Sequence, residues 1–84
     1  MIIIETDIFQ KNLEKLPKNL IKIYYKQKQI FSLNWIDSRL HLKKLLGSED
    51  YSFRITRNYS VIFYFYKDET VLFVGIGHRK DVYD

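Results

Sequence analysis

The chain has 84 residues, enough for one small domain that we expect to span residues 1–84. Hydrophobic residues make up 46% of it, and with only 3 Gly and 1 Pro a disordered or low-complexity chain is excluded. The lack of cysteine excludes disulfides and thiolate metal sites, and it fits a reducing cytoplasm. The formal net charge of +4 favours anionic partners such as nucleic acid, the ribosome or an acidic protein.

The first segment, Ile2 to Ile4, is a run of β-branched residues and predicts a short strand at the edge of a sheet. It is too short for the apolar core of a signal peptide, and no basic segment precedes it. No run in the chain approaches the roughly 20 apolar residues of a membrane span. We therefore expect a cytoplasmic protein with no membrane partner.

Two helices are predicted next. Thr6 or Asp7 can cap the first, and Pro17 ends it and suits the first turn of the second. The apolar residues of the second helix recur at steps of three and four, which places them on one face: Leu20, Ile23, Tyr24, Ile30 and Phe31. Because the connection is so short, we predict an antiparallel helical hairpin.

Residues 51–83 contain three runs rich in β-branched and aromatic residues, broken at Arg57-Asn58 and at residues 67–70. This pattern predicts a three-stranded antiparallel meander. The run from Tyr59 to Tyr66 is apolar on both faces and belongs in the middle of the sheet. The predicted fold class is therefore α+β, with a short N-terminal strand, the helical hairpin over one face of the sheet, and a second face left partly open.

This order of elements resembles the RelE/ParE superfamily of toxins from type II toxin–antitoxin systems. Two stretches carry the resemblance most specifically: Tyr51-Ser52-Phe53-Arg54-Ile55, and the ending His78-Arg79-Lys80-Asp81-Val82-Tyr83. The resemblance implies a cofactor-free, ribosome-dependent endoribonuclease that cuts mRNA and inhibits translation. It also implies a cognate antitoxin that binds the toxin in a heteromeric assembly. ParE-like members share the fold but inhibit DNA gyrase.

Ser60 departs from the family pattern. Ribonuclease members usually carry a phosphate-binding arginine after the aromatic residue that matches Tyr59, and this chain has serine there. Two hypotheses follow: an active mRNA endoribonuclease, or a non-catalytic binding protein. The second would be either a ParE-like gyrase inhibitor or a degenerate toxin that only binds its antitoxin.

RNA cleavage by the neighbouring 2′-hydroxyl needs a proton acceptor, cations for the developing phosphorane charge, and a proton donor for the leaving 5′-oxygen. The resemblance implies Arg54 and Arg79 as the phosphate-binding cations and Tyr83 as the residue for base stacking or proton transfer. His78 is auxiliary, since an imidazole with a pKa near 6.5 can serve as acid or base. Each residue also has a purely structural alternative. Arg54 would pair with a carboxylate on the neighbouring strand, and Arg79 would be a solvated residue at a strand end. Tyr83 would anchor the C-terminus, and His78 would be a structural histidine.

Further basic residues lie in and beside the meander. Lys43 and Lys44 precede it, Arg57 lies at its first turn, and Lys80 follows Arg79. Together they predict a basic rim that binds RNA phosphates. The ordinary alternative for each of them is a solvated surface charge. The two histidines fit no metal-ligand spacing, so no metal is expected.

Overall fold

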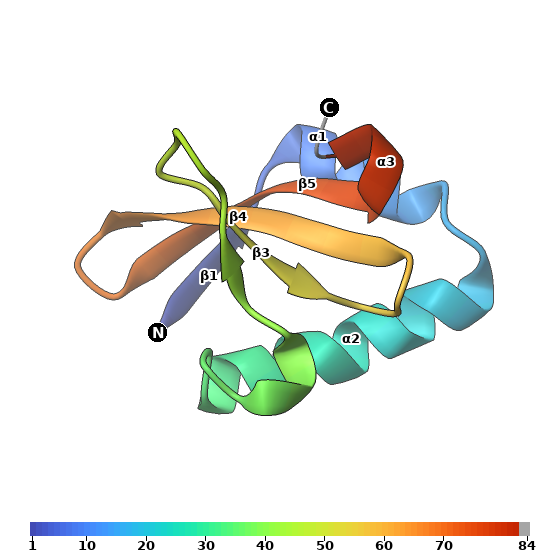
Figure 1. The fold of residues 1–84 in the computed structure, drawn as a ribbon. Helices are drawn as coiled ribbons and strands as arrows, with labels where there is room; N and C mark the ends of the chain where they lie inside the picture. Colours follow the sequence, from blue (N-terminus) through green and yellow to red (C-terminus); the bar gives the residue numbers. More distant parts are fainter. Residues whose placement is uncertain (83–84) are drawn as a thin grey trace.

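The computed structural model describes residues 1–82 and has an α+β fold (Figure 1). The predicted N-terminal strand, the two helices and the antiparallel meander are all present. The elements follow in the order β1 (Ile2–Glu5), α1 (Asp7–Glu14), α2 (Lys18–Leu33), the 3₁₀ helix η1 (Ser38–Leu40), β2 (Lys43–Lys44), β3 (Tyr51–Arg54), β4 (Tyr59–Lys67), β5 (Thr70–His78) and α3 (Arg79–Val82). No described helix is long and apolar enough to cross a bilayer.

The strands form one sheet in the order β1-β5-β4-β3-β2. The doubly apolar strand β4 is central, as predicted, and β1 is an edge strand that runs parallel to β5. Strand β3 pairs with β4 only from Tyr51 opposite Phe63 to Arg54 opposite Ser60. Strand β4 therefore continues past the start of β3.

Helices α1 and α2 cover one face of this sheet, where aromatic rings form the core. The ring of Phe31 on α2 lies 5.0 Å from Phe53, 4.9 Å from Phe63 and 5.3 Å from Phe73, measured between centroids. These partners come from β3, β4 and β5, so one helical residue binds all the strands of the meander. All four rings are fully buried, and such pairs add specific ring contacts to the hydrophobic burial.

The helix boundaries follow from local chemistry. Thr6 is the N-cap of α1, and its Oγ1 accepts a hydrogen bond of 3.2 Å from the Phe9 amide. Pro17 is the N-cap of α2, where its missing N–H leaves no hydrogen bond unmade. Gly47 lies in the turn between β2 and β3 and has a φ of 75°, which only glycine adopts easily.

A partly buried polar network links α2 to β1. The Tyr24 hydroxyl donates to Oε2 of Glu5, and Lys28 Nζ lies 3.0 Å from the same oxygen. Burial opposes ionisation of Glu5, but these two donors outweigh it and lower the pKa of the carboxyl. Burial and the Glu5 charge both raise the pKa of the Tyr24 hydroxyl, so this group stays a donor.

The second face of the sheet is covered at one end. Ser52, Ser60 and Ile62 on this face are only 2%, 2% and 6% exposed. Helix α3 folds over the end of β5, because a Cβ built on Gly77 would lie 3.4 Å from Cγ1 of Val82. The short final helix, which the sequence analysis did not predict, thus covers this end of the second face.

Candidate functional site

A row of residues crosses the second face where α3 begins. Arg54 of β3 lies opposite Ser60 of β4, and Ser60 lies opposite Gly77 of β5. Directly opposed residues share a face, so the Arg54 side chain projects toward the side that α3 covers. Two strand spacings put the backbones of Arg54 and Gly77 about 10 Å apart.

Arg79 begins α3 at the end of this row. Its backbone N–H donates to the Asn58 carbonyl over 2.8 Å, which ties the start of α3 to the turn between β3 and β4. Arg57 precedes Asn58 in that turn. The structure therefore places Arg57 and Arg79 on neighbouring backbone segments at the end of the sheet where Arg54 lies.

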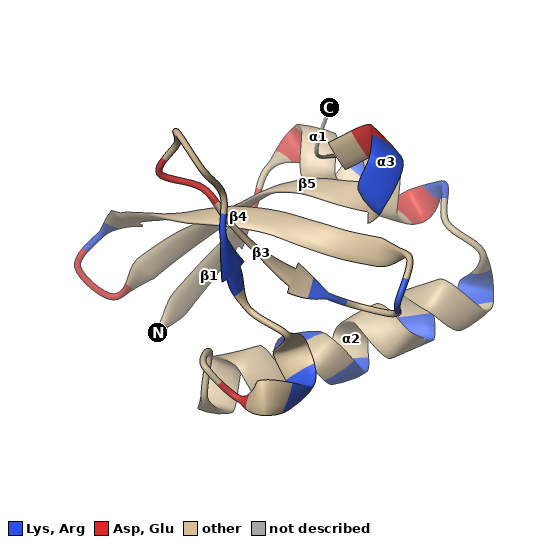
Figure 2. Cartoon of the chain, viewed as in Figure 1, with Lys and Arg blue, Asp and Glu red and all other residues tan. Residues whose placement is uncertain are grey.

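These arginines have no acidic partner within residues 1–82. All three side chains are exposed, and none of Arg54, Arg57 and Arg79 forms an ion pair with a described carboxylate. Figure 2 shows basic colour at the end of β3, in the following turn and on α3. A guanidinium with free donors can bind two phosphate oxygens at once, so this end of the sheet suits a polyanion.

Arg39 provides a contrast. Its guanidinium and backbone N–H both donate to Asp37, and the guanidinium Nη2 lies 3.0 Å from the carboxylate. These hydrogen bonds lower the pKa of Asp37 to about 2. Because its donors already bind Asp37, Arg39 is a useful control for Arg54, Arg57 and Arg79.

His78 lies on the opposite face of the sheet from Arg54. It pairs with Tyr59, whose ring packs against the hydrophobic core, and the two ring centroids are 5.4 Å apart. Its Nδ1 accepts a hydrogen bond of 3.2 Å from the Lys80 amide. The structure thus joins His78 to the first turn of α3 and separates its ring from the guanidinium of Arg54.

The remaining predicted residues are more dispersed. Lys43 pairs with Ser52, whereas Lys44 pairs with Tyr51, so the two lysines project to opposite faces. Lys44 Nζ donates to the Ser48 carbonyl over 2.9 Å and lies 5.4 Å from the centre of the Tyr51 ring. Lys80 is exposed on α3. Tyr83 lies outside the described residues.

Gln27 is a residue of the site that the sequence analysis missed. It is 9% exposed, and its Nε2 donates to the backbone carbonyls of Arg54 over 2.9 Å and Arg39 over 3.2 Å. One amide of α2 therefore holds the end of β3, from which the Arg54 side chain leaves. A sequence signal existed, because Gln27 interrupts the apolar stripe of α2 with a polar group that has to be satisfied.

No family model matches this chain, and no curated protein matches it in sequence. Several solved structures, however, match this chain in their fold. The RelB–RelE antitoxin–toxin complex from Methanococcus jannaschii contains a chain 26% identical, with 96% of this chain and 95% of that one covered at a TM-score of 0.76. The chain has a RelE-like toxin fold. Among the residues described in this RelE-like chain, no group of three or more His, Cys, Asp or Glu residues could hold a metal ion.

Other structures extend the similarity at lower identity. The RelE–RelB complex from Pyrococcus horikoshii matches at 20% identity and a TM-score of 0.76, with 93% of each chain covered. The YoeB/ParE toxin from Agrobacterium tumefaciens matches at 10% identity and a TM-score of 0.78, covering 94% of this chain and 99% of that one. At these identities the match shows the shared RelE-like fold.

Proposed function

We propose that this RelE-like chain is the toxin of a type II toxin–antitoxin pair and acts as a ribosome-dependent mRNA endoribonuclease in the cytoplasm. The observation that carries the proposal is a set of three exposed arginines at one end of the sheet, none of which forms an ion pair within residues 1–82: Arg54, Arg57 and Arg79. The similar structures from M. jannaschii and P. horikoshii were solved as toxin–antitoxin complexes, which supports an antitoxin as the partner.

In the proposed reaction the 2′-oxygen of a nucleotide attacks the adjacent phosphorus and the bond to the 5′-oxygen breaks. The products are a 2′,3′-cyclic phosphate and a 5′-hydroxyl. Arg54 and Arg79 neutralise the charge that develops on the phosphorane. Tyr83 either stacks on a base or takes part in the proton transfer from the 2′-hydroxyl to the leaving 5′-oxygen. Lys43, Lys44, Arg57 and Lys80 bind neighbouring phosphates.

His78 has a different part in this proposal. Its ring faces Tyr59, and its Nδ1 accepts the Lys80 amide hydrogen. We infer that His78 is a positioning residue, which fixes the first turn of α3 and thereby the backbone of Arg79. It does not need to contact RNA for this role.

The test is cleavage of mRNA by the purified chain in the presence of ribosomes, followed by analysis of the new ends. Arg54→Ala and Arg79→Ala should each lower the rate about 100-fold or more, because each removes a charged donor from the transition state. Arg39→Ala is the matched control and should leave the rate unchanged. Messages that stay intact with the wild-type chain would refute the nuclease proposal.

Ser60 favours the second candidate function, a non-catalytic binding protein that inhibits gyrase or only binds its antitoxin. Ser60 is 2% exposed and lies between Arg54 and Gly77 in the sheet. The family resemblance implies an arginine at this position in an active ribonuclease. Expression of wild type and Ser60→Arg distinguishes the two. If cleaved message appears only with Ser60→Arg, the natural chain is a degenerate toxin. Gyrase-dependent DNA damage with intact messages would instead identify a ParE-like inhibitor.

A further inference from the structure

Beyond the end that α3 covers, the second face of the sheet carries a partly exposed tyrosine. Ser60, Ile62 and Tyr64 leave β4 on this face at every second position. Ser60 and Ile62 are buried, whereas Tyr64 is half-buried. The four-residue separation puts the backbones of Ser60 and Tyr64 about 13 Å apart. The Tyr64 ring therefore lies on the face of the proposed cleavage site, within the span of a short oligonucleotide.

Lys43 begins a row of residues between these two positions on the same face. It pairs with Ser52, which in turn pairs with Ile62. Along the strands this row lies between Arg54 and Tyr64. An RNA strand that runs from Arg54 to Tyr64 thus passes the ammonium group of Lys43, which suits a phosphate.

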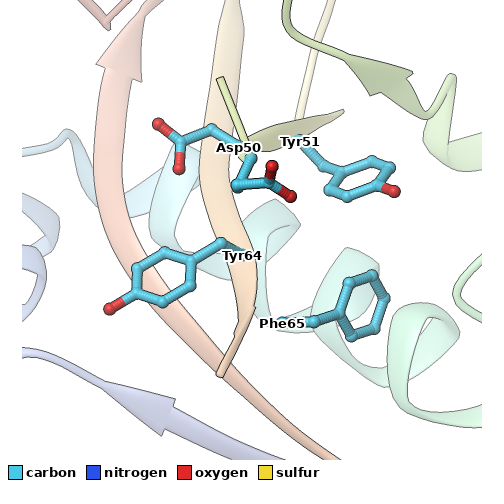
Figure 3. A pocket seen from close by; sticks show the side chains of 5 residues that line it. Asp50, Tyr51, Tyr64 and Phe65 are labelled. Atoms are coloured by element: carbon cyan, nitrogen blue, oxygen red, sulfur yellow. The ribbon is translucent and has the colours of Figure 1, made fainter. Parts of the chain in front are cut away.

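A hollow of about 400 Å³ opens beside Tyr64 (Figure 3). Its lining consists of three aromatic rings and two carboxylates: Glu49, Asp50, Tyr51, Tyr64 and Phe65. Figure 3 shows the Tyr64 and Phe65 side chains leaving β4 on opposite sides, with Tyr51 on the side of Phe65. The rings offer apolar faces and the carboxylates offer hydrogen-bond acceptors. This combination fits a flat aromatic ligand with a polar edge.

The backbone of Asp50 is held in place on both sides. Its N–H donates to Oγ of Ser48 over 3.0 Å, and its carbonyl accepts from the Leu45 N–H over 2.9 Å. Its carboxylate forms no ion pair within residues 1–82. A carboxylate on a fixed backbone can accept two parallel hydrogen bonds from a planar donor pair.

We propose that the hollow binds a guanine base of the RNA substrate, stacked on the Tyr64 ring, with its N1–H and N2–H donating to the Asp50 carboxylate. Guanine has two neighbouring donors on its Watson–Crick edge. Adenine, cytosine and uracil each offer one donor there, directly beside an acceptor that a carboxylate repels. Stacking accepts every base, so Asp50 supplies the selection. The proposal rests on the proposed function, because the nuclease role supplies RNA as the ligand.

Cations near the hollow offset the charge of its carboxylates. Lys44 Nζ lies 5.4 Å from the centre of the Tyr51 ring, which lines the hollow. Lys67 Nζ lies 5.5 Å from the centre of the Tyr66 ring, at the same end of β4. An arginine of a protein partner also presents two parallel donors, but the arginines and lysines around this face favour a polyanion over a basic segment.

The experiment uses Trp35, the single tryptophan of the chain, as a reporter. Its ring lies 6.2 Å from Tyr51 and 5.0 Å from Phe65, measured between centroids, and both of these rings line the hollow. The full chain is titrated, without ribosomes, with guanosine 5′-monophosphate, and tryptophan fluorescence is followed. Adenosine, cytidine and uridine 5′-monophosphates are titrated in the same way. We expect guanosine monophosphate to bind about tenfold more tightly than the other three, because only guanine makes the bidentate contact.

Two variants separate base selection from stacking. Asp50→Asn should remove the preference for guanine, because an amide replaces one of the two acceptors by a donor. Tyr64→Leu should weaken the binding of all four nucleotides about tenfold, because it removes the stacking surface. The matched controls are Asp68→Asn and Tyr66→Leu, which change exposed residues outside the described lining of the hollow and should bind as wild type. Unfolding midpoints establish that all four variants fold.

Three results would overturn the proposal: equal binding of the four nucleotides, a preference for guanine that persists in Asp50→Asn, or unchanged binding by Tyr64→Leu. N-acetylarginine amide that binds as tightly as guanosine monophosphate would identify a basic protein segment as the occupant instead. The nuclease proposal is tested separately, because Arg54→Ala should lose cleavage and still prefer guanine. Normal cleavage without guanine binding would defeat only the guanine proposal, and guanine binding with intact messages would defeat only the nuclease proposal.

Discussion

At the scale of single residues, Gln27 links the core to the proposed RNA site. Its amide reaches the Arg54 carbonyl over 2.9 Å from a position that is 9% exposed. Gln27→Met fills the same space but removes the donor from two backbone carbonyls. We expect a loss of unfolding free energy of about 1–3 kcal/mol and slower cleavage, because the end of β3 is no longer held.

Denaturant unfolding and the cleavage rate together measure this effect. Gln29→Met is the matched control, since Gln29 is exposed on the same helix and should tolerate the change in both assays. A destabilised Gln27→Met variant that cleaves at the wild-type rate would show that Gln27 supports the fold alone.

Glu5 gives the fold a dependence on pH. Its pKa is lowered despite burial, because Tyr24 and Lys28 donate to the carboxylate. A carboxyl with a lowered pKa in the folded state stabilises that state above its ordinary pKa of about 4.3, and this contribution is lost as the pH falls through the folded-state pKa. Glu5→Gln should therefore be less stable than wild type at neutral pH, with a smaller difference in strong acid.

Urea midpoints measured from neutral pH down to about pH 3 check this expectation. Glu14→Gln serves as the control, because the exposed Glu14 forms no ion pair in the described part of the chain. A constant difference in midpoint between Glu5→Gln and wild type at every pH would contradict the assigned role of the Glu5 charge.

At the scale of elements, α3 depends on the small size of Gly77. A Cβ at this position would lie at an ordinary contact distance of 3.4 Å from Val82, so Gly77→Ala should keep both α3 and cleavage. The γ carbons of Gly77→Val have to displace Val82 and the helix that carries it. We therefore expect slower cleavage with Val than with Ala. Circular dichroism and unfolding midpoints establish that both variants fold, and equal rates would show that α3 does not position Arg79.

The elements that the sequence predicts well are those fixed locally. The N-caps Thr6 and Pro17 and the apolar spacing of α2 depend only on residues a few positions away in the chain. The structure has the helices that they predict. The two-residue strand β2 forms only because β3 offers an edge to Lys43 and Lys44, and no local pattern signals this. The side of the sheet on which His78 lies depends on its register with Tyr59, which again is tertiary information.

At the scale of the whole molecule, charge is distributed unevenly along the sheet (Figure 2). The end of the sheet at the start of α3 carries arginines that form no ion pair with a described carboxylate, whereas the hollow beside β4 is lined in part by Glu49 and Asp50.

Lys43 and Lys44 test how far the RNA surface extends from those arginines. Each phosphate contact contributes about 0.7 to 0.9 to the slope of log K against log salt concentration, so Lys43→Ala with Lys44→Ala should reduce the slope by about 1.4 to 1.8 if both bind phosphate. A reduction of about half that size would mean that only one of the two lysines contacts phosphate, and the single variants Lys43→Ala and Lys44→Ala then identify it. Binding to ribosomes at several salt concentrations measures the slope.

Lys18→Ala with Lys22→Ala is the control, because it removes the same charge from exposed positions of α2. An equal reduction in both double variants would mean that the salt dependence reflects only the net charge of the chain. Lys43 and Lys44 would then form no specific phosphate contacts.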